Sequence, residues 1–204
     1  MFVFLKVPFH KHSWEIQIYF LYYEALKLFS RCDIVVDVGG EFDPAKKRFD
    51  HHQRSFTHSF SSLKPEKTQW SIKLSSAGLV YVHYGMQVIE QILQKLTKSE
   101  KIDQNLVAII YDKMYENFVK EIDAIDNGVE ISETKAYSIN TNLSARVSFL
   151  NPEWNETDKN EDSQFKLALE MGKEMIILSF SFCFLIKNIK FFFKFLLILV
   201  LMYH

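Results

Sequence analysis

Two adjacent histidines follow an aspartate at Asp50-His51-His52, shortly after a segment that reads as a strand ending in an acid. That segment, residues 34–38, is apolar and β-branched around Asp37, and a glycine pair follows it. Such a run favours a buried strand of a parallel sheet, which stops at the glycines. A carboxylate at a strand end and a histidine pair in the next loop are suitable ligands for a divalent metal ion. The pattern therefore predicts an α/β sheet with a metal-dependent hydrolase site at its edge.

The overall composition sets only broad bounds. The chain has 204 residues, 48% of them hydrophobic, which is enough for one large or two small domains. The net charge of −1 gives no general signal for nucleic acid, so any such contact would depend on a local basic patch. Cys32 and Cys183 lie far apart, which indicates neither a disulfide framework nor a zinc cluster and favours a reducing compartment.

Composition changes twice along the chain, which predicts three segments. Residues 1–30 are rich in aromatic side chains on all sides of any helix, and residues 31–174 have the pattern of a globular domain. Residues 175–204 consist mainly of Phe, Leu, Ile and Lys. Three lysines interrupt this last segment, and each costs about 2.5–3.5 kcal/mol at the centre of a bilayer. A surface-lying tail is therefore expected rather than a membrane span.

Helical periodicity is clearest between residues 75 and 126. Ser75 or Ser76 is expected to cap a helix whose apolar residues recur every three to four positions. A second helix is expected to begin near Asp103 and to stop at Asn127 and Gly128, where glycine allows a left-handed end. A strand, a long connection and paired helices predict an α/β domain.

The acids and histidines leave alternatives open. Asp37 either binds a metal ion or only caps the glycine turn that follows it. Neighbouring side chains of an extended loop point to opposite sides, so one of His51 and His52 is expected to bind metal. The other would orient a phosphate or support a ligand. Asp123 and Asp126 lie one turn apart at a helix end, where they are either a further part of the metal set or solvated acids.

Three arginines are candidates for contacts with a substrate. Arg48 and Arg54 flank the histidines and are able to grip a phosphoryl group, although they are equally ordinary as surface charges. Residues 141–146 predict a turn into another helix, and Arg146 at its end is expected to line the site.

Several long runs resemble the melanocyte-proliferating-gene (MYG) family of DHH-type metal-dependent hydrolases. The resemblance covers about residues 31–174 and rests on residues 32–40, 48–56, 74–81, 111–119, 121–128, 143–147 and 150–155. It implies a DHH-phosphoesterase-like α/β domain, with a mainly parallel sheet flanked by helices and incomplete at both ends. It also implies a metal-dependent phosphodiesterase, specifically a 3′–5′ RNA exonuclease.

The resemblance assigns roles to individual residues. It implies that Asp37 is a bridging acid, that His51 is a ligand, and that Asp123 or else Asp126 is a further ligand. Among the remaining candidates, Asp50 and His52 are expected to be catalytic, and the expected substrate-binding residues are Arg48, Arg54 and Arg146. The implied ion is Mn²⁺, with Mg²⁺ as the alternative, and the implied partner is RNA. Residence in the nucleus or the mitochondrion follows from the same resemblance, with the cytoplasm as the alternative.

The chain departs from the family pattern at both ends. The family opens with a His-Asn-Gly-x-Phe-His-x-Asp-Glu motif that has no counterpart before Arg31. After about Glu174, the Phe/Leu/Ile/Lys segment replaces the family's downstream portion. These departures predict a truncated form with impaired turnover. The alternative is a catalytically inactive binding or regulatory fragment of such an enzyme.

Overall fold

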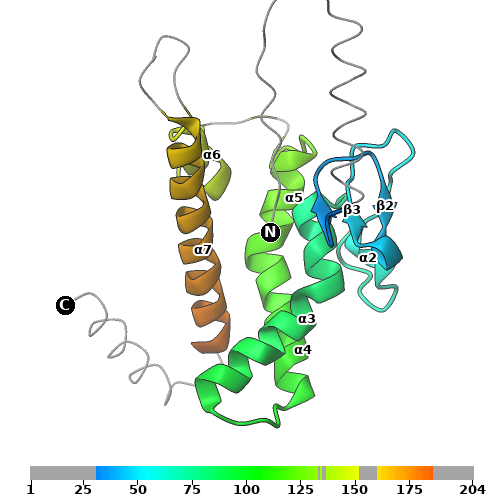
Figure 1. The fold of residues 1–204 in the computed structure, drawn as a ribbon, viewed down its shortest axis with the longest axis vertical. Helices are drawn as coiled ribbons and strands as arrows, with labels where there is room; N and C mark the ends of the chain where they lie inside the picture. Colours follow the sequence, from blue (N-terminus) through cyan, green and yellow to red (C-terminus); the bar gives the residue numbers. More distant parts are fainter. Residues whose placement is uncertain (1–30, 133, 135–136, 152–159, 186–204) are drawn as a thin grey trace, which may run out of the picture. The chain divides into compact units, whose positions relative to one another are not determined.

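The structure is a computed structural model that describes residues 31–132, 134, 137–151 and 160–185 (Figure 1). The chain divides into two compact units, Met1–Tyr84 and Gly85–His204. The described part of the first unit contains a small sheet and short helical turns, and the second unit is helical. The long helix α3 (Ser76–Thr97) begins in the first unit and continues into the second.

The sheet of the first unit has three short strands in the order β1-β3-β2. They are β1 (Val35–Val36), β2 (Phe42–Asp43) and β3 (Arg48–Phe49). β1 and β3 are parallel, whereas β2 and β3 are antiparallel. The mixed α/β class is observed, but the expectation of a mainly parallel sheet is not confirmed.

Local turns explain the mixed pairing. The 3₁₀ turn η1 (Pro44–Lys46) reverses the chain between β2 and β3, so these two strands run in opposite directions. Asp43 caps this turn by accepting hydrogen bonds from the backbone N–H groups of the second and third residues after it. The strand expected over residues 34–38 is shorter, because the φ angle of +67° at Asp37 takes the chain out of the extended region.

Aromatic side chains fill the interior of the first unit. Phe49 of β3 is fully buried, and its ring packs against His83 and Tyr84 of α3, with centroids 5.2 and 5.7 Å away. Trp70 packs edge-on against Phe60, the first residue of α2 (Phe60–Leu63). The first turns of α3 therefore anchor the strand that leads directly to the histidine pair.

The expected long helices are present. α3 begins at Ser76, and Asp103 caps α4 (Gln104–Met114), both as expected from the sequence. A π-helical turn, η2 (Tyr115–Val119), follows and joins α5 (Lys120–Asp126). The helical run ends at Gly128 with a φ angle of +68°, which confirms the predicted left-handed stop. The π-helical turn was not predicted, because the apolar spacing continues through it.

Two further helices complete the described part of the second unit. α6 (Leu143–Ser148) is capped by Asn142, which confirms the helix expected in this region. α7 (Glu161–Leu185) contacts α4, η2 and α6 and continues unbroken past residue 174. The predicted segments 1–30 and most of 175–204 lie outside the described residues, so the three-part division stays a prediction. Among the described helices, none combines the length and the apolarity that a membrane crossing requires.

Candidate metal centre

The loop after β1 places an acid beside the histidine pair. The backbone N–H of Asp37 donates to the carbonyl of Phe49 at 3.0 Å, which ties the end of β1 to the end of β3. Three residues of this loop, Asp37, Gly39 and Gly40, have φ angles between +66° and +97°. Left-handed angles are easily adopted by glycine but are strained for aspartate, so the loop holds Asp37 in a conformation that its side chain disfavours.

Asp37, His51 and His52 form a cluster that is suited to a divalent ion. One ligand atom from each residue lies within 4.8 Å of the other two. Nε2 of His51 is 3.7 Å from Oδ1 of Asp37. Two donors that each lie about 2.1 Å from one ion are at most about 4.2 Å apart, so this pair fits with little adjustment. His51 is buried whereas the other two are exposed, so the cluster opens to solvent on one side.

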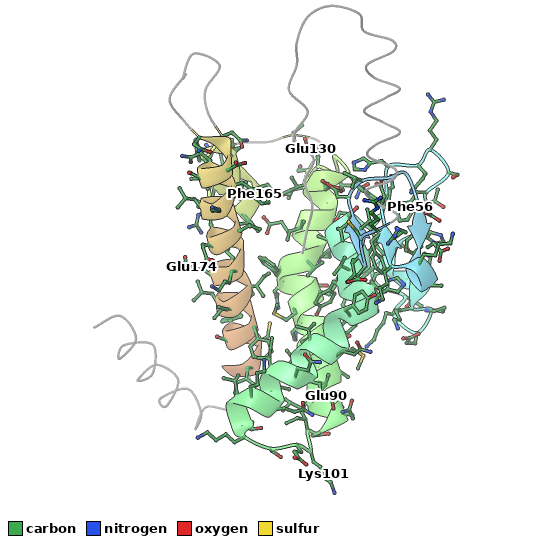
Figure 2. All side chains as sticks on the ribbon, viewed as in Figure 1. Phe56, Glu90, Lys101, Glu130, Phe165 and Glu174 are labelled. Carbon is green, nitrogen blue, oxygen red and sulfur yellow. The ribbon has the colours of Figure 1, made fainter. Side chains whose placement is uncertain are left out.

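The two histidine rings are neighbours. Their centroids are 4.2 Å apart, and therefore the expectation that they point to opposite sides of an extended loop is wrong. The ring of Phe56 packs edge-on against His51 at 6.3 Å between centroids. Phe56 is labelled in Figure 2, beside the strands of the small sheet. The loop turns immediately after β3, which brings both imidazoles to the same side as Asp37.

Asp50 is the buried anchor of this loop. Asp50 is 2% exposed, and its carboxylate accepts hydrogen bonds from the N–H of Gly40 at 2.6 Å and from the N–H of His52 at 3.0 Å. Oδ1 of Asp50 is also 2.6 Å from Nδ1 of the His52 ring. A side-chain N–H of Gln53 donates to the Asp50 carbonyl at 3.2 Å. One carboxylate thus joins the glycine loop to the histidine loop.

The charge of Asp50 determines the tautomer of His52. Burial favours the neutral acid, but the hydrogen bonds from Gly40 and His52 outweigh it and hold the pKa of Asp50 below its usual value. The carboxylate is therefore ionised at neutral pH and accepts a hydrogen bond from Nδ1 of His52, which carries the proton. Nε2 of His52 is left as the atom that is able to bind an ion, accept a proton or, in the imidazolium form, donate one.

The two predicted acids of the second unit, Asp123 and Asp126, differ from each other in burial and contacts. Asp123 is fully buried and accepts a hydrogen bond from the hydroxyl of Tyr115 at 2.9 Å. Burial raises the pKa of the Tyr115 phenol, and the neighbouring carboxylate raises it further. Asp126 is exposed at the end of α5. Both acids lie in the second unit, and their assignment as metal ligands stays a prediction.

The three predicted substrate arginines differ in their contacts. The guanidinium of Arg48 donates to the carbonyls of Lys46 and Cys32. It therefore links the segment before β3 to the segment before β1. Arg54 is exposed beside the histidine loop. Arg146 lies in the second unit, where its guanidinium is 3.2 Å from the sulfur of Met175. Their roles in binding substrate stay predictions.

Two contributors to the cluster were missed by the sequence interpretation. Gly40 supplies the backbone N–H that fixes Asp50, and the ammonium of Lys73 lies 5.5 Å from the centroid of the Phe56 ring. Lys73 is distant from the histidine pair in the sequence and belongs to no pattern of its own. The sequence shows that Gly40 follows the candidate ligand Asp37, but only the folded loop shows that its N–H donates to the carboxylate of Asp50.

Comparison with known proteins gives a consistent result. Residues 24–185 match a family model for MYG1 exonucleases, which carries the description "Uncharacterised protein family (UPF0160)". The chain is 50% identical over 145 residues to the MYG1 exonuclease of Homo sapiens, covering 70% of this chain and 37% of that protein. No solved structure matches the chain.

Relatives in other animals give similar values. The MYG1 exonuclease of Bos taurus is 50% identical over 145 residues, covering 70% of this chain and 36% of its own length. A MYG1 protein of Caenorhabditis elegans is 47% identical over 146 residues, covering 71% of this chain and 41% of its own length. The chain thus spans well under half the length of these relatives.

Proposed function

This chain belongs to the family of the MYG1 exonucleases, and we propose that it is a metal-dependent hydrolase that cleaves phosphodiester bonds in RNA from the 3′ end. The observation that carries the proposal is the cluster of Asp37, His51 and His52, whose ligand atoms lie within 4.8 Å of one another. A carboxylate and two imidazoles are the donors that Mn²⁺ accepts readily, and Mg²⁺ is the alternative.

Each residue of the cluster has a role that follows from its surroundings. A divalent ion held by Asp37, His51 and His52 would supply Lewis acidity toward the phosphodiester and would make a water molecule more acidic. Asp37 and His51 provide the closest pair of donors, at 3.7 Å. The exposed ring of His52 presents Nε2, because Asp50 fixes its Nδ1. His52 therefore either completes the ligand set or, as the imidazolium, donates a hydrogen bond to a phosphoryl oxygen.

The finer features are part of the same proposal. The DHH-type architecture, a 3′–5′ direction of cleavage and residence in the nucleus or the mitochondrion rest on the family resemblance. RNA as the substrate agrees with the word exonuclease in the names of the human and bovine relatives. Substrate phosphates would meet the exposed Arg54 next to the histidine loop.

A specific observation favours impaired turnover as the second candidate. Among residues 31–132, 134, 137–151 and 160–185, the structure brings together one potential metal cluster, with three ligands. A two-metal mechanism needs ions about 3.5–4 Å apart, and three ligands fill one site at most. This form would then bind one ion and RNA with little cleavage, as a binding or regulatory fragment.

Degradation of a 3′-labelled RNA in the presence of Mn²⁺ separates the candidates. The native chain is compared with His51→Ala and with a matched control, His58→Ala, which removes an exposed imidazole outside the cluster. Cleavage that is lost in His51→Ala and kept in His58→Ala supports the hydrolase. The same background in all three chains, together with Mn²⁺ binding by the native chain, supports the inactive fragment. RNA cleavage that survives His51→Ala would contradict both.

A further inference from the structure

The start of α3 contains a buried hydroxyl group that no described residue satisfies. Ser76 is 2% exposed, and its Oγ has no hydrogen-bond partner among the residues that the structure describes. A buried hydroxyl without a partner costs about 1–3 kcal/mol, so such groups are rare in native proteins. An alanine at position 76 would avoid this cost, because it has no hydroxyl group. The serine therefore calls for a partner beyond the residues that the structure describes.

The helix terminus supplies further donors at the same place. Ser75 caps α3: its Oγ accepts from the N–H of Gly78 at 3.1 Å, and its carbonyl accepts from the N–H of Leu79 at 2.9 Å. This leaves the amides of Ser76 and Ala77 as the donors at the start of a 22-residue helix. The Cα–Cβ bonds of a helix tilt toward its N-terminus, so the Ser76 hydroxyl lies at the same end as these amides. Ala77 is exposed, so solvent reaches this end of α3.

The segment that leads into α3 adjoins the candidate metal cluster. Lys73 holds its ammonium 5.5 Å from the ring centroid of Phe56, and that ring packs against His51. The N–H of Leu74 donates at 2.9 Å to the carbonyl of His58, whose ring also packs against Phe56. One aromatic ring is thus shared by the approach to α3 and by the cluster. The approach also brings a positive charge, which favours an anion.

We propose that the N-terminus of α3, with the Ser76 hydroxyl, seats a phosphate group of the substrate. A phosphate oxygen would accept hydrogen bonds from the Ser76 hydroxyl and from the amides of Ser76 and Ala77, and the helix dipole stabilises negative charge there. This inference rests on the proposed function for the identity of the substrate. The anion site itself needs no metal ion.

Titration of the full 204-residue chain with inorganic phosphate tests the site. The titration is followed by ¹H–¹⁵N NMR in EDTA, so that binding to a metal ion makes no contribution. The amides of Ser76 and Ala77 are expected to shift in a saturable manner. Ser76→Ala is expected to weaken phosphate binding about tenfold or more, because it removes a hydrogen bond to a charged group. Ser71→Ala, an exposed serine of the same segment, is expected to leave binding unchanged.

Stability without phosphate gives an independent readout. Ser76→Ala is expected to leave the melting temperature of the phosphate-free chain unchanged or to raise it, since an unsatisfied buried hydroxyl is removed. A fall in the melting temperature would show that the hydroxyl has a structural role, and would overturn the proposal. If the alanine variant fails to fold, Ser76→Cys keeps a similar volume with a weak donor and is expected to weaken phosphate binding.

The source of the phosphate group is decided by competition. A short RNA is expected to displace inorganic phosphate and to shift the same two amides. Failure of the RNA to do so, or equal phosphate affinity in native and Ser76→Ala chains, would overturn the proposal. Mn²⁺ affinity is measured in parallel and is expected to be unaffected by Ser76→Ala. If the native chain binds phosphate but does not bind Mn²⁺, this result would contradict the proposed hydrolase function and leave the phosphate site supported.

Discussion

Oδ1 of Asp50 lies 2.6 Å from Nδ1 of His52, and the same buried carboxylate accepts a hydrogen bond from the N–H of Gly40. The carboxylate therefore fixes both the orientation of the exposed imidazole and the loop that carries Asp37. Partners of this kind, which hold a ligand or catalytic group in place, are costly to remove although they touch no substrate themselves. Asp50 therefore helps to hold the candidate ligands Asp37 and His52 in place.

Replacing Asp50 tests this dependence. Asp50→Asn keeps the shape of the side chain but removes the charge that holds the proton on Nδ1 of His52. We expect Mn²⁺ affinity or RNA cleavage to fall about 10–100-fold, measured by calorimetry and by the labelled-RNA assay. Asp33→Asn changes an exposed acid near the same sheet and is expected to have no effect on either quantity. An unchanged affinity and rate in Asp50→Asn would show that His52 needs no such support.

The backbone of Asp37 gives a prediction that separates stability from metal binding. Its φ angle of +67° suits glycine, whereas a residue with a Cβ atom is strained there by about 1–2 kcal/mol. In urea unfolding of the metal-free chain, Asp37→Gly is expected to be about 1 kcal/mol more stable than Asp37→Ala. Both variants are expected to lose Mn²⁺ affinity, because both lack the carboxylate.

Glu41 serves as the matched control for the Asp37 variants. It is an exposed acid of the same loop and is not among the described residues with a positive φ angle. At that position glycine is expected to be no more stable than alanine. The reverse order at Asp37, with alanine the more stable variant, would contradict the left-handed conformation of the loop.

A buried hydrogen bond in the second unit carries a stability prediction. The Tyr115 hydroxyl donates to Asp123, and both side chains are fully buried. Tyr115→Phe removes this donor from the carboxylate, and we expect the free energy of unfolding to fall by about 1–3 kcal/mol. Tyr137→Phe removes a hydroxyl from an exposed tyrosine and is expected to change the free energy of unfolding by less than about 0.5 kcal/mol. A similar small effect at both positions would contradict the buried pair.

The same pair predicts a dependence on pH. The pKa of Tyr115 is raised in the folded protein by burial and by Asp123, so the unfolded chain loses this proton at a lower pH than the folded chain does. The contribution of the Tyr115 hydroxyl to the free energy of unfolding is complete below about pH 10, the usual tyrosine pKa. This contribution is lost as the pH rises above that value. Urea unfolding at pH 9 and above pH 10 should show a smaller fall in stability for Tyr115→Phe than for the native chain. Equal falls would contradict the raised pKa.

The helices were largely predictable from the sequence, because their signals are local. Asp103 and Gly128 mark helix ends through capping and left-handed geometry, and both ends lie where the sequence placed them. The π-helical turn η2 was not predictable, since it is a local change of hydrogen bonding within an uninterrupted helical pattern. The two-residue strands are too short for their alternation to be recognised from sequence, and their mixed pairing depends on the turn η1.

The candidate site was predictable in its residue types but not in its arrangement. Asp37 and His51 were chosen from the sequence, and the structure brings their ligand atoms to 3.7 Å. The close approach of the His51 and His52 rings was not foreseen, because it arises from the turn after β3 rather than from the alternation of an extended chain. The contact of Lys73 with Phe56 was also not foreseen, because the two residues are distant in the sequence and only the fold brings them together.

Calorimetric titration of the metal-free 204-residue chain with Mn²⁺ measures whether the cluster of Asp37, His51 and His52 binds an ion. The proposed function predicts one ion per native chain, held by Asp37, His51 and His52, whose ligand atoms lie within 4.8 Å of one another. His51→Ala is expected to weaken binding by about tenfold or more, since it removes the buried ligand, whereas His58→Ala is expected to bind as the native chain does. No binding by the native chain, or the same affinity in His51→Ala, would contradict a metal site at this cluster.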